Sequence, residues 1–303
     1  MAIIYLTYQQ IDKLKWDACI NNASNGLVYG YSFYLDAMAK NWDALVLDDY
    51  EAVMPITFNR KYAVYYLYQP AFTACLGVFG NNISAEILNR FLHAIPGKFK
   101  YWDIYFNPGN MFALPDFNLY ERKNFVLNLR NSYTELFANF KDNIKRNIRK
   151  SEKFGLLTNT NCNIDAVITL AKEQALAFAL PGQDDYENFK LLYKLLYSKE
   201  KAKIYAVSNK ENKLLAAAVF FFSHNRAYYI LVGNHPDGKT LGASHALINA
   251  FIKDHAGQNL LLDFEGSDIP SLAYFYNSFA AAEEKYSAIK LNRLPAAIRW
   301  LKK

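Results

Sequence analysis

Two halves of this chain repeat one order of secondary-structure elements, which restricts the fold more than any other feature of the sequence. Apolar and β-branched runs predict strands at 44–47, 52–58 and 64–68, a helix at 84–95 and a strand at 101–106. The second half predicts strands at 204–207, 214–222 and 227–232, a helix at 243–255 and a strand at 260–265. Aligning the halves places Leu76-Gly77 opposite Leu241-Gly242 and Asp103 near Asp263. The pattern predicts an internal duplication.

The strands at 214–222 and 227–232 are too close in sequence for parallel pairing. Four residues join them, whereas a parallel crossover needs about a dozen or more. We therefore predict an α/β (α+β) fold of two domains, each a mixed, mostly antiparallel twisted sheet flanked by helices. We expect the domains at 1–131 and 132–303, the second starting with a basic helix that ends near Gly155.

Composition and cysteine usage exclude several classes of protein. A hydrophobic content of 52% supports a large core and excludes disorder as the main state, and the net charge of +6 is compatible with anionic partners. Cys19, Cys75 and Cys162 have no CxxC spacing, which favours a reducing compartment. The start lacks a signal-peptide pattern and no apolar run could span a bilayer. We expect a soluble, cytoplasmic protein.

A glycine-rich segment between a strand and a helix suggests a phosphate site. Residues 233–240 read GNHPDGKT, which spells a P-loop, and 260–265 read LLLDFE, which is similar to a Walker B strand. Backbone N–H groups at a helix N-terminus bind anions in this arrangement. The antiparallel strand upstream and the short chain downstream argue against a P-loop NTPase, which stays an alternative that Lys239-dependent nucleotide binding would support.

The order of antiparallel strands, loop, helix, strand and helix resembles the core of the GNAT acyltransferases. Lys239-Thr240-Leu241-Gly242-Ala243-Ser244 is similar to the pyrophosphate loop of that family, Q/R-x-x-G-x-G/A, with Lys and Ser as departures. Residues 273–280, AYFYNSFA, resemble the A-x-x-h-Y-x-x-x-G-F helix, although Ala280 and Ala281 replace its Gly and Phe. The resemblance places Tyr276 on the tyrosine that serves many members as general acid.

The duplication narrows the resemblance to the FemAB branch, whose members contain two GNAT-like domains. The basic segment 143–150, NIKRNIRK, and the segment 263–267, DFEGS, also fit that branch. The resemblance implies transfer of an acyl or aminoacyl group from acyl-CoA or aminoacyl-tRNA to an amine, such as a cell-wall (peptidoglycan) precursor. The helical-hairpin arm of some members is absent. A non-catalytic binding protein on the same fold stays an alternative, and the sequence leaves the oligomeric state open.

The resemblance also assigns roles to individual residues. Tyr276 would protonate the leaving group, Glu265 would act as general base and Asp263 would orient the amine. The segment 239–244 would bind the phosphorylated carrier. Phosphates of tRNA or of a precursor would contact Lys145, Arg146 and Arg149, and Tyr68 would line a substrate groove.

Each assignment has a structural alternative. Tyr276 and Tyr68 are also compatible with core packing, and Glu265 and Asp263 are compatible with purely local hydrogen bonds. The segment 239–244 is also compatible with a plain turn. The basic residues are also compatible with a solvated face of the helix. The five histidines show no metal-binding spacing, so no metal is expected, and the chain has no G-x-S-x-G motif.

Overall fold

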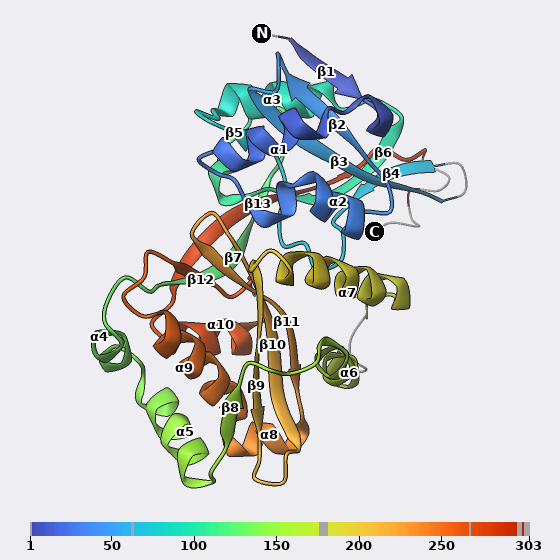
Figure 1. Ribbon diagram of the computed structural model, residues 1–303. Coiled ribbons are helices and arrows are strands. Elements are labelled where there is room, and N and C mark those ends of the chain that lie inside the picture. The colour runs from blue at the N-terminus through green and yellow to red at the C-terminus, as the bar shows by residue number, and fades with distance from the viewer. Residues whose placement is uncertain (1, 62–63, 176–180, 267, 296–298, 300–303) are drawn as a thin grey trace. The chain divides into compact units, whose positions relative to one another are not determined.

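The computed structural model describes residues 2–61, 64–175, 181–266, 268–295 and 299. The chain divides into two compact units (Figure 1). The first unit contains residues 1–123 and 285–303, and the second contains residues 124–284. The sequence predicts a division after residue 131 and a second domain that runs to the C-terminus. The structure instead groups the last residues with the first unit, because the final strand pairs there.

The first unit is a mixed sheet with the strand order β1-β2-β3-β4-β6-β13, and β5 pairs with β3. β4 and β6 are parallel, and the other neighbouring strands in this order are antiparallel. Its strands are β1 Ile3–Leu6, β2 Trp42–Leu47, β3 Ala52–Lys61, β4 Val64–Tyr68, β5 Phe79–Gly80, β6 Phe99–Tyr105 and β13 Ala282–Asn292. Its helices are α1 Lys13–Asn22, α2 Ser32–Met38 and α3 Ala85–Ala94, with short 3₁₀ turns η1 Tyr8–Gln10, η2 Val28–Gly30 and η3 Pro108–Asn110.

The second unit is a mixed sheet with the strand order β7-β12-β11-β10-β9-β8. β11 and β12 are parallel, and the other pairs are antiparallel. Its strands are β7 Tyr120–Asn128, β8 Leu157–Asn159, β9 Ala202–Ser208, β10 Leu214–Ser223, β11 Arg226–Asn234 and β12 Leu261–Asp263. Its helices are α4 Tyr133–Ala138, α5 Asp142–Lys153, α6 Ile164–Ala175, α7 Gln183–Tyr197, α8 Pro236–Leu241, α9 Ala243–His255 and α10 Pro270–Asn277.

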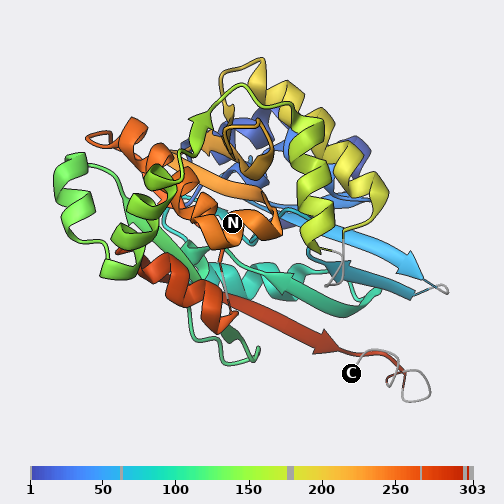
Figure 2. The same cartoon turned by 90° about the horizontal axis from the view of Figure 1, so that it is seen from below.

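Helices cover both faces of the second sheet. α9 and α10 lie on one face, and α6 and α7 lie side by side on the other (Figures 1 and 2). The core under α9 is strongly aromatic: Phe220 and Phe251 stack at 4.0 Å between ring centroids, and Tyr205 packs against both rings. Burial of such rings is the main favourable contribution to folding. The predicted fold, with mostly antiparallel sheets flanked by helices, is confirmed.

The predicted antiparallel turn is a tight hairpin. His224 and Asn225 both have a φ of +52°, as a two-residue type I′ turn requires, and β10 and β11 pair on either side of it. Two aligned glycines both adopt left-handed backbone conformations. Gly77 and Gly242, which align in sequence, have φ angles of +92° and +78°.

The basic helix expected at the start of the second domain is broken in two. α4 begins with a capping box in which Ser132 and Glu135 bond each other's backbone amides, and it ends before Asn139. The chain then becomes extended at Lys141, whose amide donates to the Ser278 carbonyl, and α5 begins at Asp142. The buried ring of Phe140 lies in this break, so the apolar pattern of the sequence continues across it.

Candidate functional site

A cleft of about 980 Å³ opens in the second unit where β11 and β12 stop pairing. The two strands pair only from Arg226 to Tyr228, after which β11 continues alone to Asn234. α6, α8, the N-terminal part of α9 and one side of α10 supply the other walls. Residues that line the cleft are Glu173, Gln174, Tyr229, Val232, Asn234, His235, Pro236, Gly238, Lys239, Ser244, His245, Leu272, Phe275 and Tyr276.

Tyr276 lines this cleft from α10. Its ring stacks on Phe264 at 4.6 Å, and only 8% of the residue is exposed. Burial raises the pKa of the Tyr276 hydroxyl, and the negative charge of Glu265 raises it further. The hydroxyl therefore keeps its proton at neutral pH and can donate it or a hydrogen bond.

Glu265 lies near Tyr276 in an uncommon backbone conformation. Its φ is +65°, which costs a residue other than glycine about 1–3 kcal/mol. Two hydrogen bonds hold this turn: the Glu265 amide donates to Asp263 Oδ1 at 2.8 Å, and the Gly266 amide donates to Asn124 Oδ1 at 2.6 Å. The charge of Glu265 acts on the Tyr276 hydroxyl, although Glu265 is not among the residues that line the cleft.

Asp263 is engaged in a buried ion pair that the sequence did not predict. Arg226 Nη1 lies 2.6 Å from Asp263 Oδ2, and Asn124 Nδ2 donates to Asp263 Oδ1 at 2.9 Å. Glu284 accepts from the same guanidinium at 2.8 Å. Both Asp263 oxygens have partners, which favours local hydrogen bonding over the orientation of a substrate amine. Arg226 and Glu284 lie far apart in sequence, and no motif marks either of them.

The segment 239–244 is a junction of two helices rather than the loop we expected. Lys239, Thr240 and Leu241 end α8, Gly242 turns the chain in the left-handed region, and Ala243 begins α9. A Cβ on Gly242 would lie 2.6 Å from the Asn147 carbonyl of α5, so only glycine fits there. Lys239 and Ser244 line the cleft, and Ser244 Oγ donates to Asn234 Oδ1 at 2.5 Å. The positive end of the α9 dipole thus lies at the cleft.

Packing explains the glycines of residues 233–240, the segment that is similar to a P-loop. Gly233 belongs to β11 and Gly238 belongs to α8, so the segment does not wrap around a phosphate. A Cβ on Gly238 would lie 2.4 Å from the Leu215 carbonyl, which accounts for that glycine. Thr240 Oγ1 donates to the Asp237 carbonyl at 2.9 Å. These contacts argue against the nucleotide-hydrolase alternative.

The other predicted substrate residues lie outside the residues that line this cleft. Lys145, Arg146 and Arg149 are on α5, which packs against α8 and α9, and Lys145 Nζ donates to the Ala138 carbonyl at 2.7 Å. Arg146 and Arg149 are exposed. Tyr68 belongs to the first unit, where its hydroxyl accepts the Lys40 amide at 2.8 Å.

His245 lines the cleft, although no motif in the sequence marks it. It follows Ser244 at the start of α9 and packs edge-on against Phe275, with 5.1 Å between ring centroids. Its Nδ1 is buried without a hydrogen-bond partner among the described residues. Burial lowers the pKa of His245 to about 4, so the ring is neutral at pH 7. Its position next to the predicted anion-binding segment was the only signal in the sequence.

The buried His245 should make stability depend on pH. Its pKa is lower in the folded than in the unfolded protein, so the unfolded chain binds the extra proton and stability falls as the pH drops from 6.5 towards 4. Between pH 7.5 and 4.5 the free energy of unfolding should fall by about 2 kcal/mol more in the wild type than in His245→Gln. Urea unfolding at both pH values measures this. Equal losses in the two proteins would contradict the assignment, and His93→Gln, which alters an exposed histidine, is the control.

Comparisons with known proteins reveal the fold. The crystal structure of FemX superposes with a TM-score of 0.66 at 14% sequence identity, covering 100% of both chains. The chain has the fold of FemX. The C-terminal domain of an Agrobacterium fabrum protein assigned as a lysylphosphatidylglycerol synthetase gives a TM-score of 0.54 at 10% identity, covering 96% of this chain and 93% of that one. L-PGS from Bacillus licheniformis gives 0.52 at 13% identity, covering 86% and 87%.

Comparison by sequence, in contrast to comparison by structure, finds no related protein. No family model matches this chain, and no curated protein matches it. Within the residues that the structure describes, no helix is both long and apolar enough to cross a membrane. Within the same residues, no group of three His, Cys, Asp or Glu side chains is placed to hold a metal ion.

Proposed function

We propose that this protein is an N-acyltransferase that transfers an aminoacyl group from aminoacyl-tRNA to an amine acceptor. The observation that carries the proposal is the shared cleft of Lys239, Ser244 and Tyr276 at the N-terminus of α9. An anionic donor would bind at this helix terminus, and its carbonyl would lie between the terminus and the Tyr276 hydroxyl. The FemX fold supports a transferase of this kind.

The reaction replaces a C–O bond by a C–N bond, and it needs two proton transfers. The amine nitrogen attacks the donor carbonyl, and a C–N bond forms as the C–O bond to the ribose breaks. Glu265 takes the proton that the nitrogen loses, and Tyr276 gives a proton to the departing oxygen. The positive end of α9 and Lys239 stabilise the negative charge of the donor.

Tyr276 is a suitable proton donor for an ester leaving group. A thiol has a pKa of about 8.5, so a thiolate leaves without help from a strong acid. A ribose alkoxide is a far stronger base and needs a proton during departure. Tyr276, whose pKa is raised by burial, is protonated at all physiological pH values and can supply it. A protonated tyrosine in the cleft is compatible with aminoacyl-tRNA, and acyl-CoA is the competing donor.

The surface of α5 also supports a polyanionic donor. Arg146, Arg149 and Lys150 are exposed on this helix, which packs against the α8–α9 junction. Basic side chains beside the cleft would contact tRNA phosphates, and binding would weaken as salt is added. The acceptor is proposed from the family resemblance alone: an amine, with a cell-wall precursor as the first candidate.

The two donors can be compared directly. The protein is incubated with tRNA charged with radiolabelled amino acids, or with labelled acetyl-CoA, together with L-lysine methyl ester and an amine-bearing muropeptide precursor. We expect labelled amide from charged tRNA. Amide from acetyl-CoA alone would overturn the donor assignment. Tight binding of charged tRNA without amide from any acceptor would favour a non-catalytic binding protein.

A further inference from the structure

A second tyrosine, Tyr229 of β11, lines the same cleft as Tyr276. Only 4% of Tyr229 and 8% of Tyr276 is exposed. Among the described residues, neither hydroxyl makes a hydrogen bond, although most polar groups buried this deeply have a partner. Neither oxygen is completely enclosed by protein atoms, so both can be reached from the cleft. The cleft therefore contains two nearly buried hydroxyls that are available to a ligand.

The ring of Phe264 holds both tyrosines in place. It stacks on Tyr276 at 4.6 Å and meets Tyr229 edge to face at 6.1 Å between ring centroids. Tyr229 also packs against Phe220 at 5.2 Å. These contacts use the aromatic rings and leave the hydroxyls unused. The two hydroxyls are thus positioned by the core while they remain free to bind.

The backbone of β11 is irregular at Tyr229. The register with β10 shifts between Val219 and Phe220, so β11 has one extra residue just after Tyr229. Such β-bulges redirect a side chain and are frequent next to active sites. On the other edge of β11, pairing with β12 ends at Tyr228. Tyr229 therefore enters the cleft where the strand departs from regular pairing on both edges.

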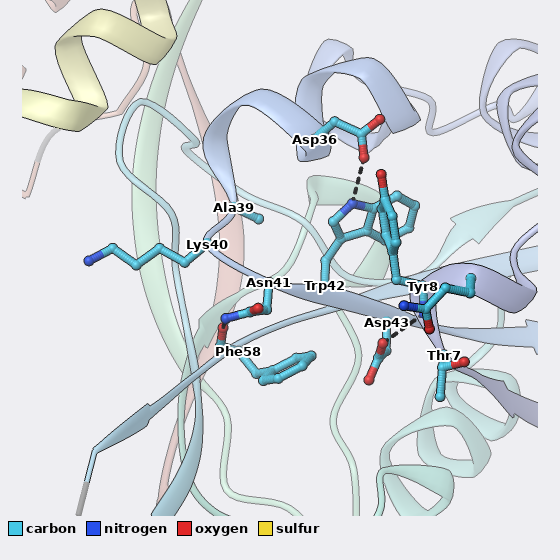
Figure 3. Close-up of a pocket in the computed structure, with 10 residues that line it drawn as sticks. Thr7, Tyr8, Asp36, Ala39, Lys40, Asn41, Trp42, Asp43 and Phe58 are labelled. Carbon is cyan, nitrogen blue, oxygen red and sulfur yellow. Dashed lines mark hydrogen bonds between the residues drawn. The ribbon is translucent and has the colours of Figure 1, made fainter.

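The pocket of about 470 Å³ in the first unit shows no such convergence of polar groups (Figure 3). Trp42 Nε1 donates to Asp36 at 3.0 Å on one side of β2. Asp43 points to the other side, where it accepts the Tyr8 amide at 2.9 Å. Successive residues of a strand face opposite sides of the sheet, so these partnered groups do not enclose one site.

The environment of Tyr229 restricts what its hydroxyl can do. Burial raises the pKa of the Tyr229 hydroxyl well above its usual value, and the neighbouring Tyr276 raises it further. The hydroxyl is therefore protonated at neutral pH and acts as a hydrogen-bond donor. The proposed reaction needs one more donor, because negative charge develops on the carbonyl oxygen as the amine attacks. Removing one donor to such an oxygen typically lowers kcat by about 10²–10³-fold.

We propose that the Tyr229 hydroxyl donates a hydrogen bond to the carbonyl oxygen of the aminoacyl group, an inference that rests on the proposed function. Tyr229 keeps its proton throughout. The hydrogen bond strengthens as the C–N bond forms and the carbonyl oxygen becomes negative. It weakens again when the C=O bond is restored and the C–O bond to the ribose breaks. Tyr276 gives its proton to that departing oxygen, so each hydroxyl serves one oxygen of the ester.

Infrared spectroscopy of a bound donor analogue tests this role. The probe is 3′-glycylamino-3′-deoxyadenosine with ¹³C at the carbonyl, used at saturation, because glycine avoids any selectivity for a larger side chain. The carbonyl stretching frequency should be lower in the wild type than in Tyr229→Phe, because a hydrogen bond weakens the C=O bond. Tyr205→Phe should give the wild-type frequency. This control removes another buried hydroxyl, from a ring that packs against Phe220 at 5.5 Å.

Kinetics and stability separate this role from packing. Tyr229→Phe should lower kcat for aminoacyl transfer by about 10²–10³-fold with little change in KM. The variant keeps the ring and removes a hydroxyl that bonds to no described residue, so its urea unfolding midpoint should be no lower than that of the wild type. A wild-type kcat or a wild-type carbonyl frequency in Tyr229→Phe would overturn the role of Tyr229 and leave the proposed function intact.

Failure of the proposed function has a different result. A wild-type protein that does not bind the analogue would overturn the aminoacyl donor, and the role of Tyr229 with it. Should Tyr229→Phe fail to fold, 3-fluorotyrosine at position 229 replaces it. Its hydroxyl is more acidic and therefore a stronger donor, so the carbonyl frequency should fall below the wild-type value. An unchanged frequency in that protein would also reject the proposal.

Discussion

Replacing Tyr276 by Phe should lower kcat for aminoacyl transfer by about 10²–10⁴-fold, the usual range for loss of a positioned acid. The change removes one hydroxyl from the cleft wall and keeps the ring that stacks on Phe264. The fold should therefore be unchanged, and KM should change little, because the proton is needed only as the C–O bond breaks. Steady-state kinetics with charged tRNA, with circular dichroism as the check on folding, measures this.

A matched control separates catalysis from packing. Tyr205→Phe also removes a buried hydroxyl from the second unit, one that donates to Asp254 at 2.8 Å outside the residues that line the cleft. This variant should keep full activity. A Tyr276→Phe enzyme as active as the wild type would contradict the proton-donor role, and equal losses in both variants would indicate a general effect on stability.

Replacing Arg226 by Met should lower the free energy of unfolding by about 3–5 kcal/mol, because it leaves two carboxylates without their counter-ion. The Arg226 side chain is 13% exposed, and the Asp263 side chain is 6% exposed. Although burial opposes its charge, the carboxylates of Asp263 and Glu284 raise the pKa of Arg226, so the guanidinium is always charged. Urea unfolding at pH 7 measures the loss.

An exposed ion pair gives the scale for this effect. Lys213 lies 2.7 Å from Asp237 with both side chains about half exposed, so Lys213→Met should change the free energy of unfolding far less than Arg226→Met. The triple change Arg226→Met, Asp263→Asn, Glu284→Gln should recover part of the stability, because it removes the unpaired charges. A loss in Arg226→Met no larger than in Lys213→Met would contradict the buried-network account.

Local patterns predicted the elements that hold the cleft. The helix expected at 243–255 matches α9. The short connection between the strands at 214–222 and 227–232 correctly indicated that β10 and β11 are antiparallel. These features depend on neighbours in sequence, through apolar spacing and turn length. The glycine at 242 was also found, because the alignment of the two halves singled it out.

Features that depend on contacts between distant parts of the chain were not predicted from the sequence. β13 pairs with β6 through Ala288–Asn292, far along the chain from its partner, so the C-terminal segment was assigned to the wrong side of the expected division. The ion pair of Arg226 with Glu284 joins residues that are 58 positions apart in the chain. His245 was overlooked because its unusual property, a buried ring nitrogen without a partner, arises only from packing against α10.

The most direct test of the account is a crystal structure with a stable donor analogue, in which an amide replaces the ester between the amino acid and the 3′-terminal adenosine. The account predicts that the phosphate end lies at the N-terminus of α9 near Lys239 and Ser244. It also predicts that the Tyr276 hydroxyl lies within hydrogen-bond distance of the atom that replaces the ester oxygen. An analogue bound elsewhere, with this cleft empty, would contradict the central claim.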